Sequence, residues 1–299
     1  MSKKDDLEVI KKVFAYINQE NISMEEMGKN PCERNRCFFS KKLLSQMWDV
    51  TMLQHGKIEA LKFPAFLTSA IPSFLEEMSA KGDLEKIKQI FAYVNQENIS
   101  GEEMGVKNNQ VNQGKKPTLV DTNCGYLKST PLMSAASKGH HQVCEYLVTR
   151  QEANLEARDT LGQTALICAA RSNHPEVIKV LLNHNANCKA KNRHGWHAAS
   201  EAALGGNLDA LKILVEKDGD VIDLKGYNGQ TPLIAASRER RVDVCKFLVE
   251  ELNANVDLKD DDGRTALEHA YYSDITKILK KKGCVTKNKR FMSIFHRIF

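Results

Sequence analysis

Two cysteines and a histidine near the start of the chain have side chains that could bind a metal. Cys32 and Cys37 enclose four residues, and His55 follows further along the chain. A structural zinc site of this type needs a second ligand pair at a finger-like spacing. No second cysteine pair follows at such a spacing, which argues against a zinc site.

The stretch LKDDDGRTALEH, residues 258–269, contains the Asp-x-Asp-Gly of a calcium-binding loop. If Gly263 is placed at the sixth loop position, Leu258 falls on the first ligand position and His269 on the last. Both positions should be acidic, so we do not expect this loop to bind calcium. We predict no metal site and no cofactor for the chain.

Motifs of catalysis are missing from the sequence. The GKK at 114–116 lacks the earlier glycine and the following Ser or Thr of a phosphate-binding loop. There is no paired His with Glu on a helix, no Ser nucleophile elbow and no dinucleotide-binding turn. We predict that the protein is not an enzyme and has no small-molecule substrate. A site assembled from distant residues within 1–105 is the alternative.

The composition is that of a packed protein, with 42% hydrophobic and 27% charged residues among 299. The net charge of +5 is uneven, because residues 280–299 carry seven Lys or Arg and no acidic residue. The start of the chain shows no secretory signal, and the apolar stretch 63–74 is too short to span a bilayer. With eight cysteines, these features predict a cytoplasmic protein, or a nuclear one, with free thiols.

A phrase similar to Thr-Pro-Leu returns at nearly constant intervals along the second half of the chain. An alanine follows five residues later, and a glycine usually precedes the phrase by two residues, as in a tight turn with positive φ. The phrases begin, in steps of 34, 33, 34 and 34 residues, at Thr130, Thr164, His197, Thr231 and Thr265. This period predicts five stacked helix-turn-helix repeats, numbered here from one to five.

The segments TPLMSAASKGHHQVCEYLV, TALICAARSNHPEVIKVLL and TPLIAASRERRVDVCKFLV resemble ankyrin repeats, and the resemblance covers about residues 128–284. It implies an all-α solenoid with hairpin-like loops, with four full repeats and a short capping repeat in 121–284. The histidine that usually follows Thr-Pro-Leu, and its bond to the Thr hydroxyl, are missing from all five repeats. The third repeat also has His197 and Ala199 for Thr and Leu, so we expect it to lack a helix cap and to be the weakest.

Four residues that could take part in chemistry have a structural interpretation within the repeats. Cys144 and Cys245 share one repeat position and are interpreted as small buried hydrophobic residues. His140 and His174 lie at the turn between the two helices of their repeats, where a structural role is expected.

The first part of the chain contains an internal duplication, because 7–28 returns as 84–105. Its apolar residues have helical spacing, so 1–105 is predicted to be either a small helical domain or a helical extension of the stack. The polar segment 106–120 is predicted to be a linker. Residues 285–299 form a basic amphipathic tail that either binds an anionic membrane or a partner groove, or caps the last repeat.

The resemblance implies a non-enzymatic scaffold or adaptor that binds another protein through a concave surface of hairpin tips and first helices. The positions carried over to this surface are Arg171, Arg193, His194, Trp196, Tyr227, Asn228, Arg238 and Glu239. Trp196 and Tyr227 are expected to be exposed anchors, or else to pack against a neighbouring tip. The alternative function is binding of a membrane or nucleic-acid surface through the tail.

A basic column stands just before the tips and consists of Arg158, Lys191, Lys225 and Lys259. It is interpreted either as a solvated face or as a sign that the partner has an acidic patch.

Overall fold

The computed structural model describes residues 71–96, 99, 104, 118–125 and 127–283. The chain divides into two compact parts, 1–131 and 132–299. Cys32, Cys37, His55, the first copy of the duplication and the tail 285–299 lie outside the described residues, so the predictions for them stay predictions. Within the described residues, helices are joined by loops with isolated β-bridges, which confirms the predicted all-α class.

The first part contains a helix pair, α5 (Ile71–Lys81) and α6 (Leu84–Gln96), and a short 3₁₀ helix, η1 (Leu119–Asp121). The apolar stripe predicted for α6 is buried, since Ile87 and Ile90 are fully covered. Leu119 and Val120 are also buried, so the end of the predicted linker 106–120 is packed.

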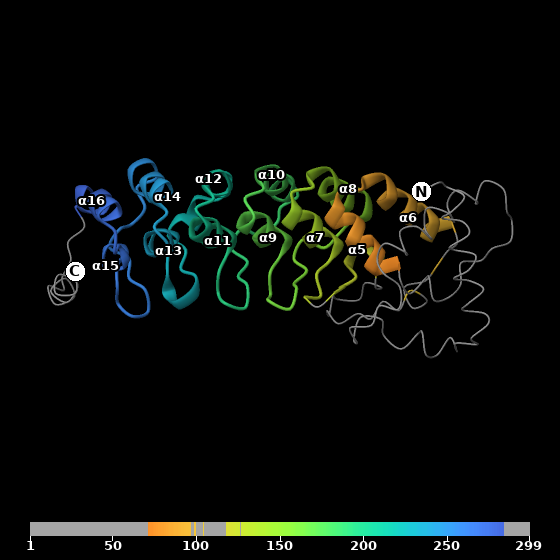
Figure 1. Cartoon of the computed structure of the whole chain (residues 1–299), viewed down its shortest axis with the longest axis horizontal. Helices are drawn as coiled ribbons and strands as arrows, with labels where there is room; N and C mark the ends of the chain where they lie inside the picture. Colours follow the sequence, from red (N-terminus) through yellow and green to blue (C-terminus); the bar gives the residue numbers. More distant parts are fainter. Residues whose placement is uncertain (1–70, 97–98, 100–103, 105–117, 126, 284–299) are drawn as a thin grey trace, which may run out of the picture. The chain divides into compact units, whose positions relative to one another are not determined.

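The second part is a stack of helix pairs, which Figure 1 shows in two rows, with the first helices nearer the hairpin loops and the second helices further from them. The first helices are α7 (Pro131–Lys138), α9 (Ala165–Arg171), α11 (Ala198–Gly205), α13 (Pro232–Arg238) and α15 (Ala266–His269). The second helices are α8 (His141–Gln151), α10 (Pro175–Asn183), α12 (Leu208–Lys217), α14 (Val242–Lys246) and α16 (Ser273–Lys281). A π-helical turn, η4 (Phe247–Glu251), continues α14.

Alanines allow the first helices to pack closely against one another. Neighbouring first helices contact each other from α9 through α11 and α13 to α15. The alanines predicted at the fifth position after the anchor are completely buried in the first four repeats, where they are Ala135, Ala169, Ala202 and Ala236. Small side chains at these positions bring the helix backbones together, so the stack is continuous through the repeats.

Tight turns with a left-handed glycine form the hairpin tips. The φ angle is +73° at Gly162, +83° at Gly195 and +74° at Gly263, as the sequence predicted. A polar side chain inside the turn holds it closed. The Oδ1 atom of Asp159 accepts the backbone N–H groups of Leu161 and Gln163, each at 2.8 Å.

The third repeat has a helix cap, so the prediction that it lacks one was wrong. The Nδ1 atom of His197 accepts the backbone N–H of Ser200 at 3.3 Å. The proton on Nε2 is then available to the carbonyl of Leu224 at 3.0 Å, and the Ser200 hydroxyl lies 2.7 Å from Nε2. Histidine and a small hydroxyl residue have exchanged places relative to the family pattern, which preserves a contact between the two positions.

The fifth repeat rebuilds the same contact differently. The Glu268 carboxylate accepts the backbone N–H of Thr265 at 2.9 Å and its hydroxyl at 3.3 Å, forming a capping box. The bond from a histidine to the Thr hydroxyl is absent from all five repeats, as the sequence predicted, but the third and fifth repeats make other bonds between the same two positions.

Candidate functional site

The predicted site residues come from two hairpin tips and the ends of two first helices. Arg193, His194 and Trp196 belong to the third tip, and Tyr227 and Asn228 belong to the fourth, in the short 3₁₀ helix η3 (Tyr227–Gly229). Backbone bonds join successive tips. The N–H of Arg193 donates to the carbonyl of Leu161 at 2.9 Å, and that of Asp261 donates to the carbonyl of Asn228 at 3.0 Å. The stack thus places the tips side by side.

Trp196 is not the exposed anchor that one interpretation of the sequence predicted. Only 8% of it is exposed, and its ring packs against Tyr227 with the centroids 5.6 Å apart. The alternative, packing against a neighbouring tip, is correct for Trp196. Tyr227 differs, because 41% of it is exposed above the tryptophan.

Arg171 is engaged within the stack. Its guanidinium donates two hydrogen bonds, at 3.0 and 3.3 Å, to the buried carboxylate of Glu201 in the next repeat. Asn192 donates to the same carboxylate at 3.1 Å. The hydrogen bonds to Glu201 raise the pKa of Arg171 and join the second repeat to the third.

Arg238 and Glu239 largely satisfy each other. Arg238 donates from Nε to Glu239 at 3.1 Å and from its terminal nitrogen to the side-chain oxygen of Gln230 at 3.1 Å. Their charges cancel at close range, so they contribute less field to the surface than two separate charges would. The sequence placed both residues on the surface, but it could not show that they pair.

The basic column contains two residues that connect adjacent repeats. Arg158 donates to the carbonyl of Gly162 at 3.0 Å and to that of Lys191 in the next repeat. Lys225 donates to the carbonyl of Lys259 at 2.7 Å. Within the described residues, no hydrogen bond or ion pair engages the side chains of Lys191 or Arg193, and both are exposed.

A second set of connections between repeats was only partly visible in the sequence. In the second, third and fourth repeats, the tenth residue after the anchor bonds back to the end of the preceding first helix. Asn207 donates to the carbonyls of Ala170 and Arg171 at 2.9 and 2.8 Å, and Arg241 donates to that of Leu204 at 2.9 Å. His174 lies 3.1 Å from the carbonyl of Ser137, which confirms its structural role. The fixed position of these polar residues in the period was the available signal.

Cys144 and Cys245 are poor nucleophiles. Burial raises the pKa of Cys144 to about 12 and that of Cys245 to about 11, so both remain protonated thiols. This confirms their interpretation as small buried hydrophobic residues. The residues of the rejected calcium loop also bond internally, since Asp260 lies 2.6 Å from Nε2 of buried His269.

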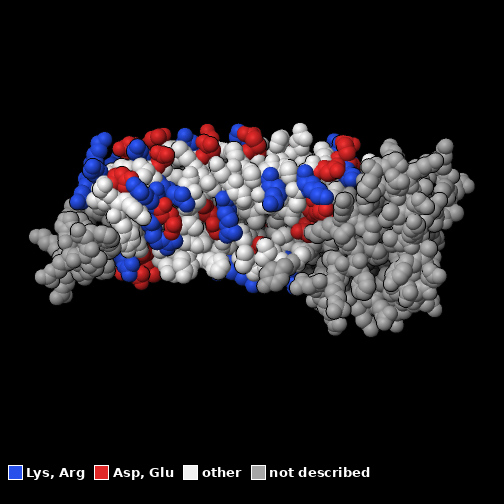
Figure 2. Space-filling view, viewed as in Figure 1, with Lys and Arg blue, Asp and Glu red and all other residues white. Residues whose placement is uncertain are grey.

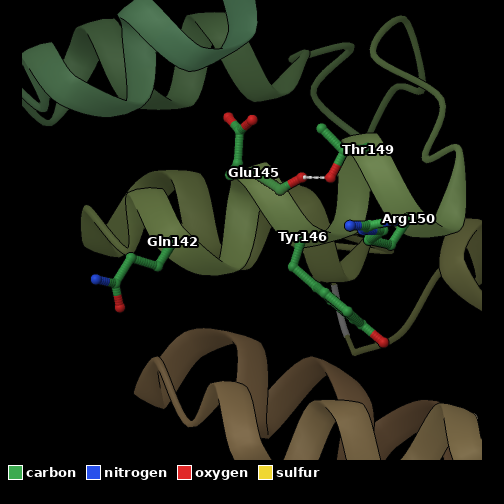
Figure 3. Close-up of a pocket in the computed structure, with 5 residues that line it drawn as sticks. All are labelled: Gln142, Glu145, Tyr146, Thr149 and Arg150. Carbon is green, nitrogen blue, oxygen red and sulfur yellow. Dashed lines mark hydrogen bonds between the residues drawn. The ribbon is translucent and has the colours of Figure 1, made fainter.

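A shallow pocket lies on α8, and Figure 3 shows that its five labelled side chains all come from this helix and point in different directions. The hydroxyl of Thr149 donates to the backbone carbonyl of Glu145 at 2.6 Å. The lining residues are Gln142, Glu145, Tyr146, Thr149 and Arg150. They do not form the nucleophile-and-base arrangement that a catalytic site requires.

In the part of the chain that the structure describes, three or more His, Cys, Asp or Glu side chains do not gather into a metal-binding group. Among the same residues, every helix is too short or too polar to cross a membrane.

Comparison with known proteins places the chain among proteins with the same repeat. A family model of ankyrin repeats matches residues 78–192 and 196–290. Human BCL-6 corepressor-like protein 1 is 29% identical over 121 residues, which is 40% of this chain and 7% of that protein. The ankyrin repeat and KH domain-containing protein mask-1 of Caenorhabditis elegans is 31% identical over 115 residues, or 38% of this chain and 4% of that protein. The chain therefore spans only a small fraction of the lengths of these relatives.

The matched region confirms the resemblance seen in the sequence and extends it toward the start of the chain. The match begins at residue 78 and includes all of α6. Whether residues 1–105 form a small helical domain or a helical extension of the stack stays a prediction. The predicted domain boundaries at 105 and 120 stay predictions.

Proposed function

This chain belongs to the ankyrin repeat family, and we propose that it is a non-enzymatic scaffold that binds a partner protein through the concave surface of its hairpin tips and first helices. The observation that carries the proposal is the half-exposed ring of Tyr227, which lies beside the exposed third tip with Arg193 and His194. Tyrosine and arginine are enriched at the centres of protein interfaces. Solenoid proteins in general use such extended surfaces for binding.

The size of the stack suits a protein partner. Helices that pack at about 10 Å give a strip of roughly 40 Å across four to five repeats. Such a strip can bury the ~800 Å² that each partner contributes to a standard interface. The third and fourth tips lie near the middle of this strip, where interface anchors are usually found.

The proposed location is the cytoplasm or the nucleus. The five cysteines in the described residues are all free, and most are buried. Free thiols are typical of reducing compartments. The alternative contact with a membrane or nucleic acid through 285–299 rests on the sequence of the tail, which lies outside the described residues.

The proposal is tested with Tyr227→Ala in the full chain. Partners recovered by affinity capture from a cell lysate are identified and titrated against the original chain and the variant. We expect binding to weaken at least tenfold, or ~1.4 kcal/mol, with an unchanged circular-dichroism spectrum. Tyr271→Ala is the matched control, because Tyr271 is also exposed, at 57%, but lies in the last repeat. Equal losses in both variants, or none in Tyr227→Ala, would place the binding surface elsewhere.

A further inference from the structure

We propose that the partner binds as an extended acidic peptide segment, about six residues long, that lies across the tips of the second, third and fourth repeats. The inference rests on the proposed function and specifies the chemistry of its partner. The basic tip surface is defined by the exposed residues Arg158, Lys191, Arg193, His194, Lys225 and Tyr227.

The three tips carry positive charge without exposed negative charge. The tip segments 158–162, 191–196 and 225–229 together contain one acidic residue, Asp159. Only 6% of Asp159 is exposed. Its carboxylate is already engaged by two backbone N–H groups of its own turn. The exposed cations Lys191, Arg193 and Lys225 therefore face an incoming ligand without an opposing carboxylate among the tip residues.

The tip cations are more available than the arginines of the first helices. Arg171 is held by Glu201, and Arg238 by Glu239 and Gln230. Lys191 and Arg193 have no such ion pair within the described residues. Lys225 bonds to a neutral carbonyl, and that bond leaves its positive charge uncompensated. An anionic ligand gains more from the tips than from the helix ends.

Acidic residues limit the extent of the basic tip surface. Asp261 and Asp262 are exposed on the fifth tip, and Glu156 and Asp223 are exposed in the loops that lead to the second and fourth tips. In Figure 2 the edge of the stack that holds the tips is blue and white below α9 to α13, while red appears below α15. A broad anionic surface such as a membrane would meet these carboxylates, whereas a narrow chain can avoid them.

The dimensions and the aromatic residue favour a peptide. Neighbouring repeats are about 10 Å apart, so three tips extend over roughly 20 Å, the length of about six extended residues. The exposed face of Tyr227, supported from below by Trp196, offers an apolar contact for one side chain of the segment. The surface also presents fewer cations than the roughly six to ten phosphate contacts of a strongly salt-dependent nucleic-acid interface.

The test uses the full chain and a displayed library of random peptides about 12 residues long. Selected peptides are synthesised with a fluorescent label and titrated against the original chain and against the double variant Lys191→Glu, Arg193→Glu. The control variant is Lys246→Glu, Lys277→Glu, which makes the same change in net charge on the exposed sides of α14 and α16. The tail is present in every variant, so any contribution from its charges cancels.

We expect the selected peptides to be rich in Asp and Glu. The tip variant should bind them at least about tenfold more weakly and with a smaller salt dependence, whereas the control variant should lose less than about twofold. Selected peptides that lack acidic residues, or that bind the tip variant as well as the original chain, would overturn the inference. The proposed function would still stand if Tyr227→Ala weakened binding of a recovered partner.

The same comparison includes two other anionic probes, a labelled oligodeoxythymidine and vesicles that contain phosphatidylserine. If either probe binds more tightly than the selected peptides and depends on Lys191 and Arg193, the ligand class is wrong. If no peptide binds and Tyr227→Ala changes no partner affinity, both the inference and the proposed function fail.

Discussion

His197 and Thr265 cap equivalent helices with different chemistry. Thr265 is supported by a carboxylate from Glu268, while His197 uses one ring nitrogen as the cap and the other to reach Leu224. The histidine is completely buried and must stay neutral to accept the N–H of Ser200. Burial lowers its pKa to about 4, and the positive charge of Lys191 acts in the same direction. This substitution makes the stability of the third repeat sensitive to acid.

We expect the free energy of unfolding of the unsubstituted chain to fall as the pH falls from 7 to 5, because of the low pKa of His197. The substitution His197→Thr should remove this part of the pH dependence. The folded pKa of His197 is about 4, below the ordinary value of about 6.5, so the contribution is complete above pH ~6.5. It is lost progressively as the pH falls toward 4, by about 2 kcal/mol at pH ~5. The measurement is urea unfolding of both proteins at the two pH values. An equal loss in His197→Thr would show that other groups cause the acid sensitivity.

At the scale of a hairpin tip, one polar residue is replaced to make room for an aromatic ring. The second, third and fifth tips have Asp159, Asn192 and Asp260 inside the turn, and the fourth has Gly226. A Cβ atom on Gly226 would lie 3.1 Å from the Trp196 ring and 3.1 Å from the Ser200 hydroxyl. The Trp196 ring of the third tip therefore occupies the space next to Gly226 that a polar side chain would need.

We expect Gly226→Asp to destabilise the chain, although it restores the residue type of two other tips. The new side chain would crowd the buried indole, and overpacking of this kind typically costs 1–3 kcal/mol. Urea unfolding measures the loss in Gly226→Asp and in the double variant with Trp196→Ala. The cost of the aspartate should be smaller when the ring is absent. If Gly226→Asp is neutral or stabilising by itself, the indole does not restrict this position.

Sequence and structure agree where a feature repeats and differ where neighbouring repeats compensate for each other. The period predicted the helix pairs, the buried alanines and the left-handed glycine at Gly195, because each depends on a local rule. The burial of Trp196 and the bond between Arg171 and Glu201 depend on which residue the next repeat offers, about 30 positions away. Such contacts between residues of neighbouring repeats cannot be inferred from the sequence of one repeat alone.

At the scale of the whole stack, the third repeat is better connected than its sequence suggested. Its cap is present, Glu201 accepts Arg171 from the second repeat, and Asn207 donates to two carbonyls of that repeat. The fifth repeat has the opposite character. Its first helix, α15, is four residues long, and the first helix that it packs against extensively is α13. In a stack held by contacts between neighbours, such a repeat opens most easily.

We therefore expect native-state amide exchange to be at least about tenfold faster in α16 than in α12, a difference of ~1.4 kcal/mol in opening free energy. The physical reason is that, among residues 71–283 that the structure describes, opening the fifth repeat breaks contacts with the fourth repeat alone, whereas opening the third breaks contacts with the second and the fourth. Hydrogen exchange followed by mass spectrometry on the full chain measures both segments at once, and α10 serves as an internal reference within the stack. Faster exchange in α12 than in α16 would restore the third repeat as the weak point. In that case the replacement of Leu by Ala199 would matter more than the cap and the connections that the structure shows.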